Sequence, residues 1–227
     1  MFLPSIITYT GHSGSGKSSS LIRQLLKENI SQPCFGFITV RRMNHGQLSF
    51  CPLTAEAFGP HLKQLKNIQE KHLQQAIDQF LGPRPLEKVP LQTHPRHSAQ
   101  NQQPGPPSCV LPLEQLKALI LDQLKQAKQQ DAVLILDEIG GLELLDDDWF
   151  NQFMPFLDEK LQGFWVFKSQ AQLFKQANRR GLAPSQLELL AKRHDELHAH
   201  LKSLGPVIDL NAKESTAAFL AAQKEEA

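Results

Sequence analysis

The stretch GHSGSGKS, residues 11–18, decides the fold that this sequence predicts. Glycines at positions 11, 14 and 16 let the backbone curl so that successive N–H groups point inward and form a nest for an anion. Lys17 adds a positive charge for the β- and γ-phosphates of a nucleotide, and the Ser18 hydroxyl is an oxygen ligand that suits Mg²⁺. The stretch therefore matches the G-x-x-x-x-G-K-[ST] pattern of a phosphate-binding loop.

The flanking residues supply the context that this pattern requires. Residues 5–10 are a short β-branched and aromatic run, which predicts a buried strand ending at the first glycine. Apolar residues at positions 21, 22, 25 and 26 then predict a helix that ends before Pro33, and the positive end of its dipole faces the nest. We expect the triphosphate to contact the stretch from 11 to 19, with no individual role for the second and third residues: Gly11, His12, Ser13, Gly14, Ser15, Gly16, Lys17, Ser18 and Ser19.

A pair of acidic residues follows the most apolar run of the chain. Residues 132–136 are continuously apolar, as expected for a strand that is covered on both faces of a parallel sheet. Asp137 comes next, where a carboxylate can hold Mg²⁺ together with Ser18, and Glu138 lies one residue further on, where it can activate or orient water. Acidic pairs also commonly begin solvated loops, so this interpretation depends on the phosphate-binding loop.

At these residues the chain resembles a known family. The run LILDEIGGLEL, residues 134–144, is similar to the D-E-I-G-x-x-E-L signature of the small P-loop nucleoside-triphosphatases of bacteria and archaea, and residues 36–39, GFIT, are similar to their G-F-x-T. The resemblance implies a RecA-like P-loop fold and Mg²⁺-dependent cleavage of several nucleoside triphosphates to the diphosphate and phosphate. It also implies that residues 11–18 hold phosphate and metal, that Asp137 holds metal and that Glu138 activates water.

The chain departs from that family at the position of an arginine. The family continues G-F-x-T with an acidic residue and an arginine, whereas this chain has Val40, Arg41 and Arg42. Phosphoryl transfer needs positive charge on the transferred group, and Arg41, Arg42, Arg179 and Arg180 are candidates to supply it. Solvated surface positions explain each of these arginines more simply. Glu143 belongs to the family signature but is also compatible with closing a turn.

The rest of the chain alternates between strand and helix patterns. Strands are predicted at residues 34–40 and 48–53, joined as a hairpin, and at 164–167 and 207–210. One amphipathic helix is predicted over 62–80, and others over 113–127, around 149–157 and over 184–204. The expected fold is α/β, a mostly parallel sheet with helices on both faces, in one domain of residues 1–227 with ligands at the carboxyl ends of the strands.

A proline- and glutamine-rich segment interrupts this pattern. Eight of the 15 prolines lie between positions 82 and 112, so we predict a mobile, disordered insertion at residues 83–111. His94 and His97 inside it lack a third metal ligand in view and are interpreted as solvated. The histidines at 194, 198 and 200 are interpreted as core and surface residues of a helix rather than as a metal site.

Composition narrows the partners and the compartment. The chain has 24 basic and 23 acidic residues, so no large field attracts nucleic acid or acidic lipid. The cysteines at 34, 51 and 109 have no C-x-x-C spacing, which favours a reducing cytoplasm. No run approaches the roughly 20 apolar residues of a membrane span. The expected partners are a nucleoside triphosphate and Mg²⁺, and the sequence does not identify a protein partner.

Three functions are compatible with these residues. The favoured one is hydrolysis of a nucleoside triphosphate by water that Glu138 activates. The second is a phosphotransferase, a nucleoside or nucleotide kinase, in which Glu138 accepts the acceptor's proton and a mobile lid excludes water. The third is a nucleotide-dependent switch with slow turnover. The chain has no N-K-x-D or L-S-G-G-Q segment, which disfavours a conventional GTPase and a transport ATPase.

Overall fold

The computed structural model describes most of the chain in eight segments. These segments are residues 6–11, 14–28, 32–44, 47–82, 84–85, 113–139, 141–158 and 160–211. In chain order they form β1 (Ile6–Gly11), α1 (Lys17–Glu28), β2 (Cys34–Asn44), β3 (Gln47–Thr54), α2 (Ala55–Lys66), α3 (Glu70–Leu81), β4 (Arg84–Pro85), α4 (Leu113–Gln129), β5 (Val133–Ile139), η1 (Leu142–Leu145), α5 (Asp147–Phe153), η2 (Met154–Phe156), β6 (Gln162–Lys168), α6 (Gln170–Arg179), α7 (Pro184–Leu204) and β7 (Val207–Asp209).

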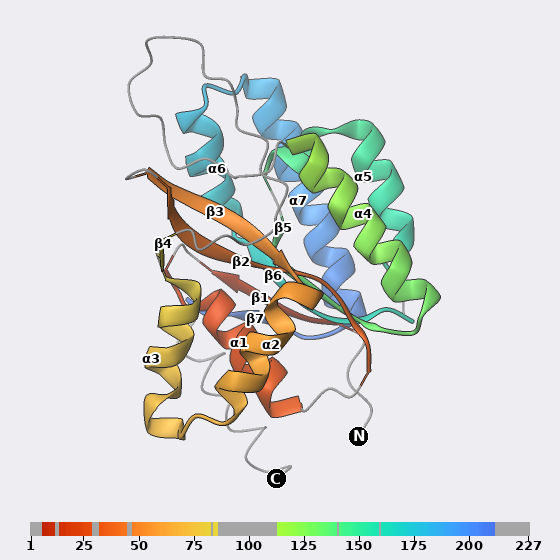
Figure 1. Cartoon of the computed structure of the whole chain (residues 1–227). Coiled ribbons are helices and arrows are strands. Elements are labelled where there is room, and N and C mark those ends of the chain that lie inside the picture. The colour runs from red at the N-terminus through yellow and green to blue at the C-terminus, as the bar shows by residue number, and fades with distance from the viewer. Residues whose placement is uncertain are drawn as a thin grey trace.

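The strands form one sheet in the order β3-β2-β5-β6-β1-β7, with β4 paired to β2 (Figure 1). Every pairing is parallel except the hairpin of β2 and β3, which is antiparallel. The hairpin and the mostly parallel α/β sheet that the sequence predicted are therefore confirmed. Because β1, β6 and β5 are parallel neighbours, their carboxyl ends lie along the same edge of the sheet.

Helices cover both faces of this sheet. In Figure 1, α4 to α7 lie on one face and α1 to α3 on the other. The alternation of side chains in β5 divides its residues between the two faces. Leu134 and Leu136 belong to the core beneath α4 to α7, whereas Val133 and Ile135 belong to the core beneath α1 to α3. The continuous apolar run of this strand is explained by burial on both sides.

The single helix predicted over residues 62–80 was wrong, because the structure has two helices there. The first, α2, begins earlier and ends at Lys66, where the Asn67 N–H donates to the carbonyls of Gln64 and Leu65. The Asn67 side chain also donates to the Lys63 carbonyl at 3.2 Å, and α3 begins at Glu70. Apolar residues of both helices pack in the same core, so the apolar period continues across the break.

Two glycines lie inside strands because neighbouring backbone approaches them closely. The strand predicted at residues 164–167 begins earlier, because Gly163 lies within β6, and a Cβ there would be 2.3 Å from the Leu134 carbonyl oxygen. Gly36 in β2 has φ of +98°, and its Cβ would be 1.8 Å from the Ile135 carbonyl oxygen. The helix α6 was not predicted. It begins after Ser169, whose hydroxyl accepts the Gln172 N–H.

The predicted insertion at residues 83–111 lies outside the described residues, except for the two residues of β4, which pair with β2. Among the helices that the structure describes, none is both long enough and apolar enough to cross a membrane.

Gly36→Ala should destabilise the fold strongly. The substitution combines an unfavourable left-handed backbone with a clash against the backbone of the central strand, so we expect a loss of about 3 kcal/mol or more. For a chain of this size that corresponds to a melting temperature lower by roughly 6–12 °C in a thermal unfolding experiment.

Gly59→Ala is the matched control. Gly59 lies in α2, and a Cβ there meets nothing within 4 Å. This variant should be as stable as the wild type or more stable by about 0.5–1 kcal/mol, because alanine favours the helix. Equal melting temperatures for Gly36→Ala and the wild type would contradict the packing described for β2 and β5.

Candidate functional site

Three glycines with positive φ values determine the shape of the loop between β1 and α1. Gly11, Gly14 and Gly16 have φ of +145°, +82° and +88°, which residues with a Cβ rarely adopt. The loop therefore turns sharply from the carboxyl end of β1 into the first turn of α1, where the predicted residues Ser18 and Ser19 are half-buried. His12 and Ser13 lie outside the described residues. The strand, loop and helix follow one another as the sequence predicted.

Two polar side chains of this loop are directed inward. Lys17 is 7% exposed, and its Nζ donates a hydrogen bond to the Gly11 carbonyl at 3.1 Å. The ammonium is thereby folded back over the loop. The Ser15 hydroxyl oxygen is buried and makes no hydrogen bond among the described residues. A buried polar atom without a partner is unusual, and it is consistent with a group that completes the loop when bound.

The loop contacts the acidic pair directly. Ser18 Oγ donates to Asp137 Oδ1 at 2.9 Å, across 119 residues of sequence. Asp137 is 1% exposed, and its Oδ2 accepts the Thr39 N–H of β2 at 2.9 Å. The Thr39 hydroxyl donates to the Asp137 carbonyl at 3.1 Å. The hydroxyl and the carboxylate proposed as metal ligands are thus brought together, and both are oxygen ligands of the kind that Mg²⁺ prefers.

A bulge lies at the acidic pair. Leu136 pairs with Trp165 and Ile139 with Phe167, so three steps along β5 match two along β6. Leu136 and Ile139 consequently lie in the same core, although regular alternation would place them on opposite faces. The sequence had placed Glu138 after the strand, whereas its backbone belongs to β5 at this bulge. Its side chain lies outside the described residues.

A buried arginine holds the segment that follows the acidic pair. Arg193 of α7 is 7% exposed, and its Nη1 donates to the Leu144 carbonyl of η1 at 2.7 Å. Its Nη2 forms an ion pair with Asp147, and its guanidinium stacks over the Phe150 ring at 4.9 Å. These contacts attach η1 and α5 to α7 and thereby fix the chain just beyond β5.

A buried lysine holds the same segment from α4. Lys117 is 5% exposed and pairs with Asp146 and, at 2.8 Å, with Glu114. Burial alone would lower the pKa of Lys117, but its hydrogen bonds to the two carboxylates raise it above its ordinary value. Asp146 also accepts the Trp149 N–H and so caps α5. The Lys117 ammonium, together with this N–H, holds the pKa of the Asp146 carboxyl below its ordinary value.

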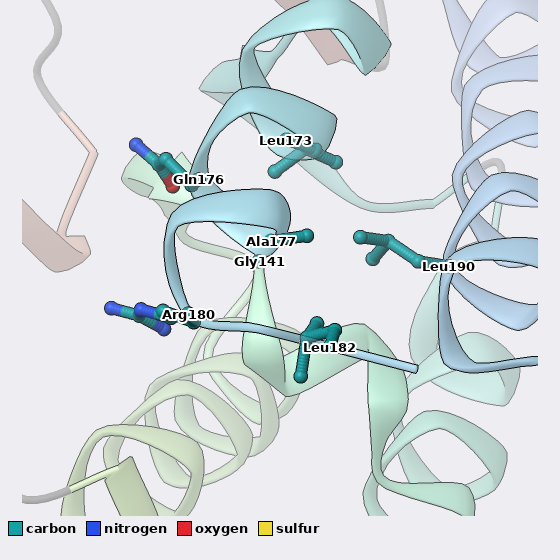
Figure 2. Close-up of a pocket in the computed structure, with 7 residues that line it drawn as sticks. All are labelled: Gly141, Leu173, Gln176, Ala177, Arg180, Leu182 and Leu190. Carbon is teal, nitrogen blue, oxygen red and sulfur yellow. The ribbon is translucent and has the colours of Figure 1, made fainter. Parts of the chain in front are cut away.

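A small, mostly apolar pocket that is partly open to solvent lies beside Gly141, shortly after the acidic pair (Figure 2). Its lining residues are Gly141, Leu173, Gln176, Ala177, Arg180, Leu182 and Leu190. Figure 2 shows that the apolar side chains point into the pocket, whereas the polar ends of Gln176 and Arg180 turn away from it. Of the arginine candidates, Arg41, Arg179 and Arg180 are exposed, and the side chain of Arg42 lies outside the described residues.

The histidines of α7 act as packing groups. His194 is 6% exposed, stacks on Phe167 at 4.6 Å and donates from Nε2 to the Lys168 carbonyl at 3.0 Å. His198 stacks beside it, and burial, followed by the charges of His194 and Lys202, lowers the pKa of His198. No group of three histidine, cysteine or acidic residues suited to a metal occurs in the described part of the chain.

No protein-family model matches the chain, and no curated protein matches it. The functional assignment therefore depends on the residues and contacts themselves.

The sequence indicated some of these groups and missed others. Thr39 lies in the quoted GFIT run but was given no role. Arg193 occupies the apolar face of α7, three residues after Leu190 and next to His194, and a charged residue at such a position signals a buried contact. Lys117 gave a similar signal between apolar residues of α4.

Lys117→Met should destabilise the fold by about 1–3 kcal/mol at pH 7, because it removes the partner of Asp146. The stabilisation that a carboxyl with a lowered pKa supplies is present above its unfolded pKa of about 3.9 and is lost as the pH falls through the lower folded value. Between pH 5 and pH 2 the wild type should therefore lose more stability than the variant. Urea unfolding at several pH values measures this difference.

Lys192→Met, an exposed change on α7, is the control and should follow the wild type at every pH. A variant at Lys117 with the same acid dependence as the wild type would show that this pair does not hold the α5 segment.

Proposed function

We propose that this protein is a Mg²⁺-dependent nucleoside-triphosphatase that hydrolyses a nucleoside triphosphate to the diphosphate and phosphate. The observation that carries the proposal is the hydrogen bond from Ser18 Oγ to Asp137 Oδ1. It joins the glycine-rich loop, whose pattern suits phosphate, to the acidic residues, whose chemistry suits a metal and a water molecule. Two sequence patterns that are each weaker alone converge on one place in the fold.

The sheet topology also supports a RecA-like P-loop fold, which is part of this proposal. The strand with the loop, β1, and the strand with the acids, β5, are parallel and are separated by β6 alone. Their carboxyl ends share one edge, which is where open α/β sheets bind ligands.

The loop would bind the phosphates through its backbone and Lys17. The positive φ values of its glycines suit an anion nest, and the dipole of α1 adds positive potential at the same point. The Lys17 ammonium would exchange the Gly11 carbonyl for β- and γ-phosphate oxygens. The buried Ser15 hydroxyl would gain a partner in the bound state.

Ser18 and Asp137 are the residues that would hold Mg²⁺. A hydroxyl and one carboxylate suit this ion because Mg²⁺ keeps several waters and takes phosphate oxygens as further ligands. When bound, the ion neutralises charge that develops on the β- and γ-phosphate oxygens. The Thr39 N–H keeps the second Asp137 oxygen in place, so the first remains directed towards Ser18.

Glu138 would serve as the base. A water oxygen forms a bond to the γ-phosphorus, the bond from that phosphorus to the β,γ-bridging oxygen breaks, and the nucleoside diphosphate leaves. The proton of the water passes to the Glu138 carboxylate and then to solvent. The bulge at the acidic pair means that strict strand alternation does not force Glu138 onto the face opposite Asp137.

Lys17→Ala should weaken binding of the triphosphate and abolish turnover without unfolding the protein. The ammonium supplies the charge that the β- and γ-phosphates require, and in the structure it donates a hydrogen bond to the Gly11 carbonyl of the loop. Phosphate release from ATP, GTP, CTP and UTP measures turnover, with and without nucleoside acceptors to separate hydrolysis from phosphoryl transfer. Lys71→Ala, exposed on α3, is the control. Wild-type phosphate release by folded Lys17→Ala would refute the proposed site.

Glu138→Gln should separate binding from chemistry. The amide keeps the shape of the side chain but loses the basic oxygen, so kcat should fall by roughly 10²- to 10⁴-fold while a non-hydrolysable triphosphate binds as well as to the wild type. Asp137→Asn should instead weaken Mg²⁺ dependence and nucleotide binding together, because an amide is a poorer ligand for Mg²⁺.

Glu188→Gln, an exposed change on α7, controls for loss of a carboxylate elsewhere. An unchanged kcat in Glu138→Gln would remove Glu138 from the mechanism, and equal Mg²⁺ dependence in Asp137→Asn would remove Asp137 from the metal site.

A further inference from the structure

A lysine is the last residue of β6, the strand that lies between the glycine-rich loop and the acidic pair of the proposed site. β6 is hydrogen-bonded to β1 on one side and to β5 on the other, and Lys168 is its last residue. In the parallel register Lys168 lies opposite Gly11, the first residue of the phosphate-binding loop. The acidic pair lies at the same edge on the other neighbour, β5. Lys168 is therefore placed between the loop and the acids.

The alternation of β6 determines the face on which Lys168 lies. Phe164 and Val166 pack in the core beneath α1 to α3, whereas Trp165 and Phe167 pack beneath α4 to α7. Lys168 is two residues after Val166, so it continues the row on the α1 face. That face also holds α1 with Ser18, whose hydroxyl contacts Asp137. The lysine is half-buried there, not on the open surface.

Contacts from α6 and α7 hold the backbone at the end of β6. His194 of α7 donates to the Lys168 carbonyl and stacks on the preceding Phe167. The next residue, Ser169, caps α6 by accepting the Gln172 N–H. The backbone on both sides of Lys168 is thus held, so the alternation of β6 continues to its last residue.

We propose that Lys168 contacts the γ-phosphoryl group of the bound triphosphate, as a second ammonium besides Lys17. This inference rests on the proposed function. A triphosphate held by the loop would extend its γ-phosphoryl from β1 towards the acids of β5, and β6 lies between these two strands. The charge that spreads over the γ-phosphoryl oxygens in the transition state needs positive groups around it. Lys168 would supply one from β6, the strand between the loop and the acids.

The test compares Lys168→Met and Lys168→Arg with the wild type. A contact to the γ-phosphoryl acts on the triphosphate and not on the diphosphate. Lys168→Met should therefore lower kcat by roughly 10²- to 10³-fold and weaken binding of the β,γ-imido analogue of ATP about 10-fold or more. Its affinity for ADP should stay within about 3-fold of the wild type.

Lys168→Arg keeps the charge and should retain most of the preference for triphosphate. If the wild type hydrolyses another nucleoside triphosphate faster than ATP, the imido analogue and the diphosphate of that nucleoside replace those of adenosine in these assays.

Lys175→Met, an exposed change on α6, is the matched control and should behave as the wild type in every assay. Thermal unfolding establishes that each variant is folded, and Lys168→Gln replaces Lys168→Met if the latter is not. Equal loss of ADP and triphosphate binding would identify a structural role for Lys168 and overturn the proposal.

Wild-type kcat in a folded, neutral variant at 168 would overturn it as well. In both cases loss of turnover in Lys17→Ala would leave the proposed function standing. Absence of Mg²⁺-triphosphate binding by the wild type would overturn both.

Discussion

The buried carboxylate of Asp137 is the group on which the arrangement of the site depends. A carboxylate that is 1% exposed is costly unless its oxygens are hydrogen-bonded. Here one oxygen accepts the Ser18 hydroxyl of α1 and the other accepts the Thr39 N–H of β2. Satisfying this one group aligns the first turn of α1, the middle of β2 and the end of β5. The glycine-rich loop, which leads into α1, lies at the carboxyl edge of the sheet as a consequence.

The two faces of the sheet have different tasks in this arrangement. The α1 face holds the groups that would meet a ligand, namely the loop, Ser18 and, by alternation, Lys168. Side chains on the opposite face hold the backbone at the ends of β5 and β6. Arg193 and Lys117 hold the segment beyond β5 through a hydrogen bond and an ion pair, and His194 holds the end of β6 through a hydrogen bond. Buried cations whose hydrogen bonds are satisfied by carbonyls and carboxylates give specific geometry, so the strand ends that carry the site are held in place by α4 and α7.

The placement of charges suits phosphoryl chemistry. An associated triphosphate would bring several negative charges to an edge that already has a buried carboxylate, and this requires positive groups directed at the phosphates. The dipole of α1 and Lys17 lie on the loop side, and Lys168 lies on the middle strand. The bulge between Leu136 and Ile139 adds one residue to β5 at the acidic pair, where the proposed function requires a metal ion and a water molecule. Strand bulges commonly re-aim side chains in this way beside active sites.

Local patterns in the sequence were sufficient for the loop, the hairpin and α7, because glycine spacing, turn residues and an apolar period of 3.6 residues act over short distances. The proximity of Ser18 to Asp137 could be expected from the parallel order of the strands. Only the tertiary structure decided the features that depend on which strands become neighbours. The close backbone approach at Gly163, the bulge in β5 and the register of Lys168 with Gly11 all arise from pairing between residues far apart in the chain, which no local pattern records.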